Sequence, residues 1–165
     1  MLCPPYLIRK KKAPVQKAAK ALTFAEEREA WRRSKNVSNV INAIDWAIKN
    51  RARFGIRIIN LSFGHPPAES YRTDPLSHAV ERAWAAGLVV VASAGNRGRD
   101  GYFTINAPGN DPYILTVGAM NDLNSTDRSD DVSTTYSSRG PSYGDHVLKP
   151  DLVAPGNRIV SSLAP

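Results

Sequence analysis

Two short apolar runs separated by a helical pattern dominate the middle of the sequence. Residues 56–63 and 88–91 are rich in β-branched side chains and are bounded by glycine, which predicts two strands. The run at 88–91 is unbroken, which predicts a strand buried on both faces, as in a parallel sheet. Between the runs, apolar positions recur at helical spacing, with Asp74 as the N-cap before a proline and Gly87 as the stop. The segment therefore predicts a β-α-β unit with parallel strands.

Similar patterns predict further elements on either side of this unit. An apolar stripe over residues 37–48 predicts a helix that packs on one face of the sheet. Residues 114–119 predict a third buried strand, and residues 152–154 predict a short one. Residues 134–138 alternate loosely between polar and apolar positions, which indicates another short strand. Together these elements predict an α/β fold with a mostly parallel central sheet.

The residues at the carboxyl ends of the first two strands are the candidate functional site. Parallel strands end at the same edge of a sheet, where open α/β sheets bind ligands in a crevice. Little side-chain bulk lets a ligand approach the backbone closely, and an extended peptide suits such a slot. Asn96 follows the second strand and can donate a hydrogen bond into the slot, although Gly-Asn alone indicates only a turn. The residues expected to face each other are Ser62, Phe63 and Gly64 on one side and Ser93, Ala94 and Gly95 on the other.

Five sequence blocks, taken together and in order, resemble the subtilisin-like serine proteases, or subtilases. Each block alone would be a weak indication, but five in one order are specific. The resemblance extends over residues 37–165. The blocks are IINLSFG at 58–64, VVVASAGN at 89–96, PGNDPYILTVGA at 108–119, YSSRGP at 136–141 and KPDLVAPG at 149–156.

The resemblance implies a three-layer fold with helices on both faces of the sheet, here incomplete, and a serine endopeptidase activity. It implies that Asn96 donates its side-chain N–H to the oxyanion of the tetrahedral intermediate. The two residue triplets at the strand ends would form the primary specificity pocket and bind a polypeptide substrate as an added strand. The family pattern also predicts a cis peptide bond between Ala107 and Pro108. A propeptide partner and an extracellular location are further implications of the family alone.

The catalytic triad of the family is not recognisable in this sequence. Subtilases carry Asp, His and Ser in that order, the first two upstream of every block matched here and the serine after a Gly-Thr motif downstream. His65, His78 and His146 lie outside the family's histidine motif and are expected to be structural or exposed, and Asp45 lies within a helical pattern. We therefore expect a fragment of a serine endopeptidase that is inactive alone. The alternative is a non-catalytic, peptide-binding homologue.

A second alternative is a nucleotide-binding α/β domain, because β-α-β units often bind phosphates. No Gly-x-Gly-x-x-Gly or phosphate loop opens a helix in this sequence. The sequence therefore disfavours that function.

The positive charge lies entirely in the first 35 residues. Residues 1–35 hold ten Lys and Arg against three acidic residues, whereas residues 36–165 hold twelve of each, so the first segment accounts for the whole net charge of +7. This predicts a basic segment at 1–35 and a partial subtilisin-like domain at 36–165. The segment does not resemble the family. A solvated tail with a marginal helix over 15–33 is favoured over nucleic-acid or membrane binding, and an artefactual or divergent start would also explain the abrupt change.

The chain shows neither a signal peptide nor a transmembrane pattern. The apolar stretch at residues 2–8 is interrupted by prolines and is followed, not preceded, by the basic cluster. No apolar run reaches the length that crosses a bilayer. The single cysteine, Cys3, excludes an internal disulfide. Localisation therefore rests on the resemblance alone.

Residues 121–131 are the one candidate for metal binding. They are rich in carboxylates and amides, and many subtilases bind calcium. The spacing lacks the fixed oxygen-ligand pattern and the glycine of a dedicated calcium loop. We expect a solvated loop there and predict no cofactor.

Overall fold

A computed structural model describes residues 37–160, which all belong to one of the two units into which the chain divides, residues 35–165. The basic segment with its predicted helix at 15–33 and Cys3 lies outside the described residues. The described elements are α2 (Val37–Phe54), β1 (Ile58–Leu61), α3 (Pro75–Ala85), β2 (Val89–Ser93), η1 (Gly98–Asp100), β3 (Leu115–Asn121), η2 (Arg128–Asp130), β4 (Val132–Ser133) and β5 (Leu152–Pro155).

The strands form one mostly parallel sheet in the order β1-β2-β3-β4, with β5 also paired to β3. β1 runs parallel to β2 in a register that pairs Ile58 with Val89, and β3 runs parallel to both β2 and β5. Only the short β4 is antiparallel to its neighbour, β3. The parallel β1-α3-β2 unit predicted from the sequence is confirmed, as is the α/β class.

The boundaries of α3 follow from local chemistry. The Asp74 carboxylate accepts a hydrogen bond from the Ser77 backbone N–H at 2.8 Å, so it caps the first turn. At the other end, the N–H of Leu88 donates to the Ala83 carbonyl, while Gly87 has a φ of 84°. This hydrogen-bond pattern ends a helix through a left-handed residue, which favours glycine. Both predicted ends of this helix are therefore confirmed.

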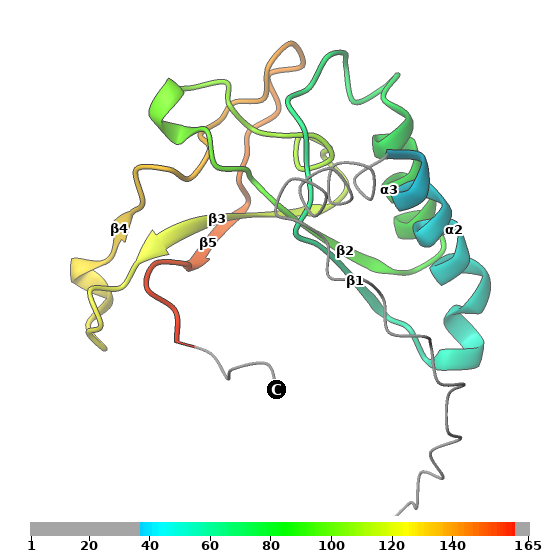
Figure 1. Cartoon of the computed structure of the whole chain (residues 1–165), viewed down its shortest axis with the longest axis horizontal. Helices are drawn as coiled ribbons and strands as arrows, with labels where there is room; N and C mark the ends of the chain where they lie inside the picture. The colour runs from blue at the N-terminus through cyan, green and yellow to red at the C-terminus, as the bar shows by residue number, and fades with distance from the viewer. Residues whose placement is uncertain (1–36, 161–165) are drawn as a thin grey trace, which may run out of the picture. The chain divides into compact units, whose positions relative to one another are not determined.

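One face of the sheet is buried under α2 and α3, which Figure 1 shows packed beside each other. Alternate residues of β2 point into this core, and α3 supplies most of the helical contacts. The partly buried stripe of α2 packs against the same cluster, as its spacing predicts. The buried core residues are Ile44, Leu76, Ala79, Val80, Ala83, Leu88, Val90, Ala92 and Ile114.

The opposite face of the sheet is apolar but exposed. Ile58 is 62% exposed and its partner Val89 is 45% exposed, and Leu115 and Leu152 are exposed as well. The prediction that the run at 88–91 is buried on both faces is therefore wrong for this structure. The physical reason is that both described helices pack on one side, so residues 37–160 supply two of the three layers expected from the resemblance.

The predicted strand at 134–138 is also wrong. The strand lies at Val132–Ser133 instead, and the following residues form a turn. Both the N–H and the hydroxyl of Thr134 donate to the Ala119 carbonyl, and the Ser137 hydroxyl accepts from the Ala119 N–H at 2.9 Å. The Ser137 hydroxyl takes the Ala119 N–H in place of a backbone carbonyl, so backbone pairing with β3 does not continue beyond Thr134.

Residues 121–131 form a loop of short side-chain-to-backbone turns. The Asn121, Asp122 and Asp127 side chains each accept a hydrogen bond from a backbone N–H two residues later. Across residues 37–160, no cluster of three or more His, Cys, Asp or Glu side chains could hold a metal ion. No helix in that part of the chain is long and apolar enough to cross a membrane.

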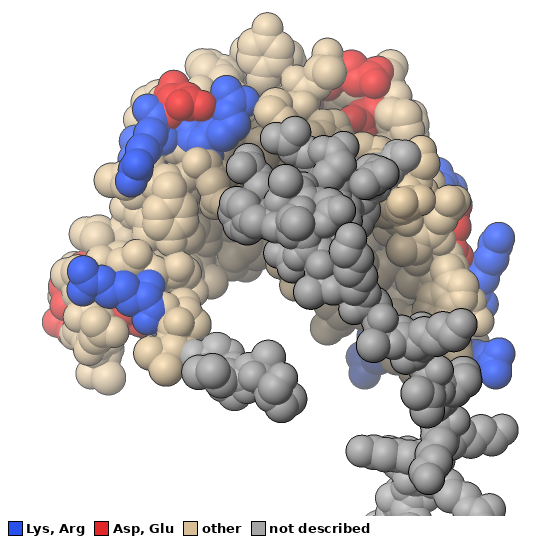
Figure 2. All heavy atoms as spheres, viewed as in Figure 1, with Lys and Arg blue, Asp and Glu red and all other residues tan. Residues whose placement is uncertain are grey.

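Charged side chains of the described residues are mixed in sign. On the face seen in Figure 2, blue and red side chains lie next to each other in several places at the margins, with uncharged surface between them. This agrees with the balanced charge of residues 36–165 in the sequence.

Candidate functional site

The carboxyl ends of β1 and β2 lie at one edge of the sheet, where the sequence places the candidate crevice. Figure 1 shows the loop after β1, the turn after β2 and the segment before β5 on the same side of the sheet. Between the two strand ends runs a third segment, residues 104–107. His65 and Ala107 exchange backbone hydrogen bonds of 3.0 and 2.9 Å, and the Asn106 N–H donates to the Ala94 carbonyl at 2.9 Å. This segment therefore joins the two strand ends.

The side chain of Asn106 lies against a glycine of each strand end. A Cβ on Gly64 would lie 3.1 Å from the Asn106 Cβ, and a Cβ on Gly95 would lie 2.8 Å from its Nδ2. Gly95 also has a φ of 110°, which L side chains rarely adopt. Asn106 Oδ1 is buried and has no hydrogen-bond partner in the described part of the chain. An unsatisfied buried acceptor is costly, which makes Asn106 a candidate contact for a ligand.

Sequence reasoning missed Asn106. It stands in a loop without periodic pattern, and its position between two glycines arises only when distant segments meet. The one local signal was its place directly before the predicted cis bond, which the structure confirms between Ala107 and Pro108.

Asn96 lies on a turn that is held from the opposite side by residues 136–138. The Arg97 N–H donates to the Ser138 hydroxyl at 3.1 Å, and the Ser138 N–H donates to the Gly95 carbonyl at 3.0 Å. Gly98, which follows Arg97, donates its N–H to the Tyr136 carbonyl at 3.0 Å. The Asn96 side chain is exposed. An amide in this position is anchored through its backbone and accessible to a ligand.

The two predicted triplets reach the same edge, but their side chains differ in direction. Ser62 is exposed, with its hydroxyl accepting from the Asn60 amide at 3.4 Å. Phe63 is half-buried and packs against the core cluster, and Ala94 is fully buried. Phe63 and Ala94 can therefore contribute backbone to the crevice, while their side chains belong to the core.

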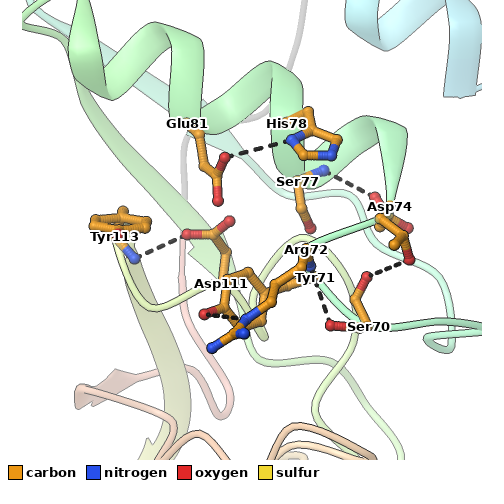
Figure 3. Close-up of polar contacts among 10 residues, drawn as sticks. Ser70, Tyr71, Arg72, Asp74, Ser77, His78, Glu81, Asp111 and Tyr113 are labelled. Carbon is orange, nitrogen blue, oxygen red and sulfur yellow. Dashed lines mark hydrogen bonds and ion pairs between the residues drawn. The ribbon is translucent and has the colours of Figure 1, made fainter.

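The histidines of the described part of the chain contact acidic or aromatic side chains. His65 Nε2 lies 3.7 Å from Asp74 Oδ2, and His78 Nδ1 lies 3.5 Å from Glu81 Oε2, the second pair being visible in Figure 3. His146 packs edge-on against the ring of Phe103. The sequence predicts that these three residues are structural or exposed. In the structure His78 and His146 are exposed, and His65 is half-buried.

Asp45, the remaining residue considered for a triad, lies on α2 as its helical pattern predicts. Its carboxylate pairs with Arg82 of α3 at 2.9 Å, so its contact joins the two helices.

A buried carboxyl group, Asp111, lies in the loop before β3. Burial raises the pKa of Asp111 to about 6, against the lowering effect of a hydrogen bond from the Tyr113 N–H at 2.8 Å. The negative charge of Glu81 raises this pKa further, and Figure 3 shows the two carboxyl groups pointing toward each other. Asp111 Oδ2 is buried without a hydrogen-bond partner in residues 37–160. The Asp111 and Glu81 carboxyl groups thus face each other between the loop before β3 and α3.

A buried ammonium group, that of Lys149, connects the residues just before β3 with those just before β5. Lys149 donates to the Ile114 carbonyl at 2.8 Å and to Asp151 at 2.7 Å, and Asp151 accepts from the Thr116 N–H at 2.6 Å. A buried charge is tolerated only when it is paired and hydrogen-bonded, as here. This cluster holds the beginning of β3 beside the beginning of β5.

Comparison with known proteins agrees with this geometry. Serine protease AprX of Bacillus subtilis (strain 168) is 38% identical over 138 residues, which is 80% of this chain and 30% of the relative. Subtilisin of Bacillus pumilus is 34% identical over 125 residues, or 75% of this chain and 38% of the relative. The solved structure of sphericase aligns with a TM-score of 0.58 and 30% identity, covering 73% of this chain and 39% of that chain.

Sphericase shares the fold of the described residues. This chain spans less than half of the length of each of the three relatives. A family model described as the subtilase family matches residues 24–164, which is most of the chain. The match contains both strand ends and the asparagine that follows them. This chain belongs to the subtilase family.

Proposed function

We infer that this chain carries the substrate crevice and the oxyanion donor of a serine-type endopeptidase. The observation that supports this most is the parallel pair β1 and β2, which ends beside the exposed amide of Asn96 on an anchored turn. Family membership supports peptide-bond hydrolysis as the reaction, and the activity of the whole protein is part of this proposal. The substrate class is polypeptide.

The chemistry assigned to the chain is binding and charge stabilisation. An extended polypeptide lies along Ser62–Gly64 and Ser93–Gly95 as an added strand, so its backbone supplies most of the hydrogen bonds. Attack on the scissile carbonyl places a negative charge on its oxygen. The side-chain N–H of Asn96 donates to that oxyanion, and its anchored backbone means that little reorganisation is needed when the charge develops. Asn106, between the two strand ends, contacts a substrate side chain that enters the crevice.

The nucleophile and the general base are not among the groups assigned to this chain. The contacts of the three histidines with acidic and aromatic side chains give no support for a general base, which must lie within hydrogen-bond reach of its proton donor. In subtilisin itself, loss of the serine or the histidine alone costs on the order of a millionfold in kcat. The chain by itself is therefore expected to bind peptide without hydrolysing it.

A fluorophosphonate probe, which reacts with activated serine nucleophiles, tests this division of roles. We expect no stoichiometric labelling of the 165-residue chain, with subtilisin as the positive control under the same conditions. We expect labelling of the native protein that contains the chain. Stoichiometric labelling of the 165-residue chain would show that it carries its own nucleophile and base.

The same measurement separates the proposed enzyme from a non-catalytic homologue. If the native protein binds peptides in the crevice but takes up no probe, the peptide-binding alternative is correct. Labelled native protein that hydrolyses peptides would exclude that alternative.

A further inference from the structure

A cavity lies next to the turn that carries Asn96, with Arg97 among its lining residues. It has a volume of about 630 Å³, and none of the residues predicted for the crevice lines it. Its size is within the range of sites that hold small molecules or side chains, roughly 300–1,000 Å³. Its main lining residues are Tyr102, Phe103, Tyr143 and His146, with Arg97 and Asp100 at the edge.

The aromatic side chains of this cavity are unusually accessible. Tyr102 is 68% exposed, Tyr143 is 65% exposed and Phe103 is 45% exposed. Clustered aromatic rings on a surface mark binding sites more often than isolated apolar residues do, because their exposure to water is unfavourable. The exposed rings therefore indicate a ligand that covers them.

The walls of the cavity are held in place on both sides. Phe103 and His146 have φ values of 61° and 56°, a region that bulky residues seldom adopt, and their rings meet edge to face at 5.7 Å. Asp145, next to His146, accepts hydrogen bonds from the Ser70 hydroxyl at 2.6 Å and the Tyr71 N–H at 2.9 Å. Strained residues that persist are fixed by their surroundings and concentrate at functional sites. These contacts fix the cavity wall at Phe103 and His146.

The charge at the cavity edge is balanced internally. Arg97 Nε lies 3.0 Å from Asp100 Oδ2, so the two charges neutralise each other. Neither therefore requires a charged ligand, and a positive ligand would also meet the Arg97 guanidinium. An uncharged aromatic or large aliphatic group fits this environment best.

Two stretches of backbone carry residues of both the cavity and the candidate crevice. Arg97 directly follows Asn96, and the turn they share is bonded to Ser138. Thr104, which is buried in the cavity wall, begins the segment that carries Asn106 between the strand ends. Cavity and crevice are therefore connected by residues 96–97 and 104–106 of this chain.

We propose that this cavity is a second subsite for the polypeptide, which takes an aromatic or large aliphatic side chain outside the primary crevice. The proposal rests on the proposed function, because it assigns the occupant to the same bound polypeptide. The aromatic rings stack on the entering side chain, and the fixed wall at Phe103 and His146 reduces the entropy cost of binding.

Binding of fluorescent octapeptides to the native protein tests the proposal. One phenylalanine is moved through each position of a serine-alanine background, and affinity is measured by fluorescence anisotropy. We expect one position at which phenylalanine, or leucine to a smaller extent, binds about tenfold more tightly than serine. That preference should disappear in Tyr143→Ala and in Tyr102→Ala, and should survive in Tyr143→Phe because the ring is kept.

Tyr113→Ala is the matched control. Tyr113 is also an exposed tyrosine, but it packs against Trp84 on α3 and does not line the cavity. The control should keep the full preference for phenylalanine. The proposal is overturned if no position shows the preference, if lysine is preferred over phenylalanine, or if Tyr102→Ala and Tyr143→Ala both retain it.

Hydrolysis of the same peptides separates this proposal from the proposed function. Peptides that bind with the expected preference but are never cleaved would contradict the endopeptidase and leave the subsite supported. Peptides that are cleaved without any dependence on the cavity variants would contradict the subsite alone. Absence of all binding would overturn the subsite.

Discussion

Gly95 combines a backbone constraint with a steric one. Its φ of 110° disfavours any side chain, and a Cβ would lie 2.8 Å from both the Asn106 amide and the Ser138 hydroxyl. Both of these neighbours are fixed by hydrogen bonds of their own backbone to the strand end or its turn. The second residue after β2 is therefore restricted to glycine by its φ and by the closeness of three segments.

We expect Gly95→Ala to reduce the free energy of unfolding by roughly 2–4 kcal/mol, from backbone strain plus overpacking. Gly101→Ala is the control, because Gly101 has a similar φ of 101° but a Cβ there would meet nothing within 4 Å. Its loss should be limited to strain, roughly 1–2 kcal/mol. Urea denaturation of the native protein measures both. Equal losses for the two variants would contradict the close packing at Asn106.

At the scale of elements, the loop before β3 carries a buried carboxyl group that faces α3 and binds its proton more tightly than usual. The Asp111 carboxyl is buried against Glu81, and its pKa is raised to about 6, above the ordinary value of 3.8. The folded protein therefore keeps this proton to higher pH than the unfolded chain does. Between pH 3.8 and a pH of about 6, binding of this proton therefore stabilises the folded state.

We expect the contribution of Asp111 to the free energy of unfolding to fall as pH rises from about 4 to about 6, by at most about 3 kcal/mol in total. Asp111→Asn should remove this part of the pH dependence, because an amide does not titrate. Glu69→Gln, at an exposed carboxyl, should leave it unchanged. Thermal unfolding between pH 4 and 7 measures the slope. A wild-type slope unaffected by Asp111→Asn would contradict the raised pKa of Asp111.

The elements also show what the sequence can and cannot predict. The ends of α3 are determined by Asp74 and Gly87, which act within one turn of the helix, so they were predictable. The parallel pairing of β1 with β2 was predictable because a helix, α3, connects the two strands. The exposure of Val89 was not predictable, because burial of a strand face depends on what lies over it. The role of Asn106 depends on contacts with Gly64 and Gly95, residues far away in the sequence.

At the scale of the whole molecule, one face of the sheet is apolar and exposed. Ile58, Val89, Leu115 and Leu152 contribute to it, and the helices of the described part of the chain lie on the other side. This chain covers 39% of sphericase, a fold relative. We propose that the rest of such a domain covers this face in the native protein.

The 165-residue chain alone is expected to self-associate through this face and through unpaired strand edges. The double substitution Ile58→Thr and Val89→Thr should reduce association while keeping β-branched residues in the strands. Analytical ultracentrifugation across a concentration series measures this. A monodisperse wild-type monomer that unfolds cooperatively would contradict the expectation.

The account depends most on the role of Asn96, which kinetics of the native protein can test directly. In Asn96→Ala, kcat for peptide hydrolysis should fall by roughly 10²–10³-fold, the size known for loss of this donor in subtilisin. KM should stay nearly constant, because the interaction forms only with the oxyanion. Asn42→Ala, at an exposed asparagine on α2, is the control and should leave both constants unchanged. An unchanged kcat in Asn96→Ala, or a loss confined to KM, would contradict the account.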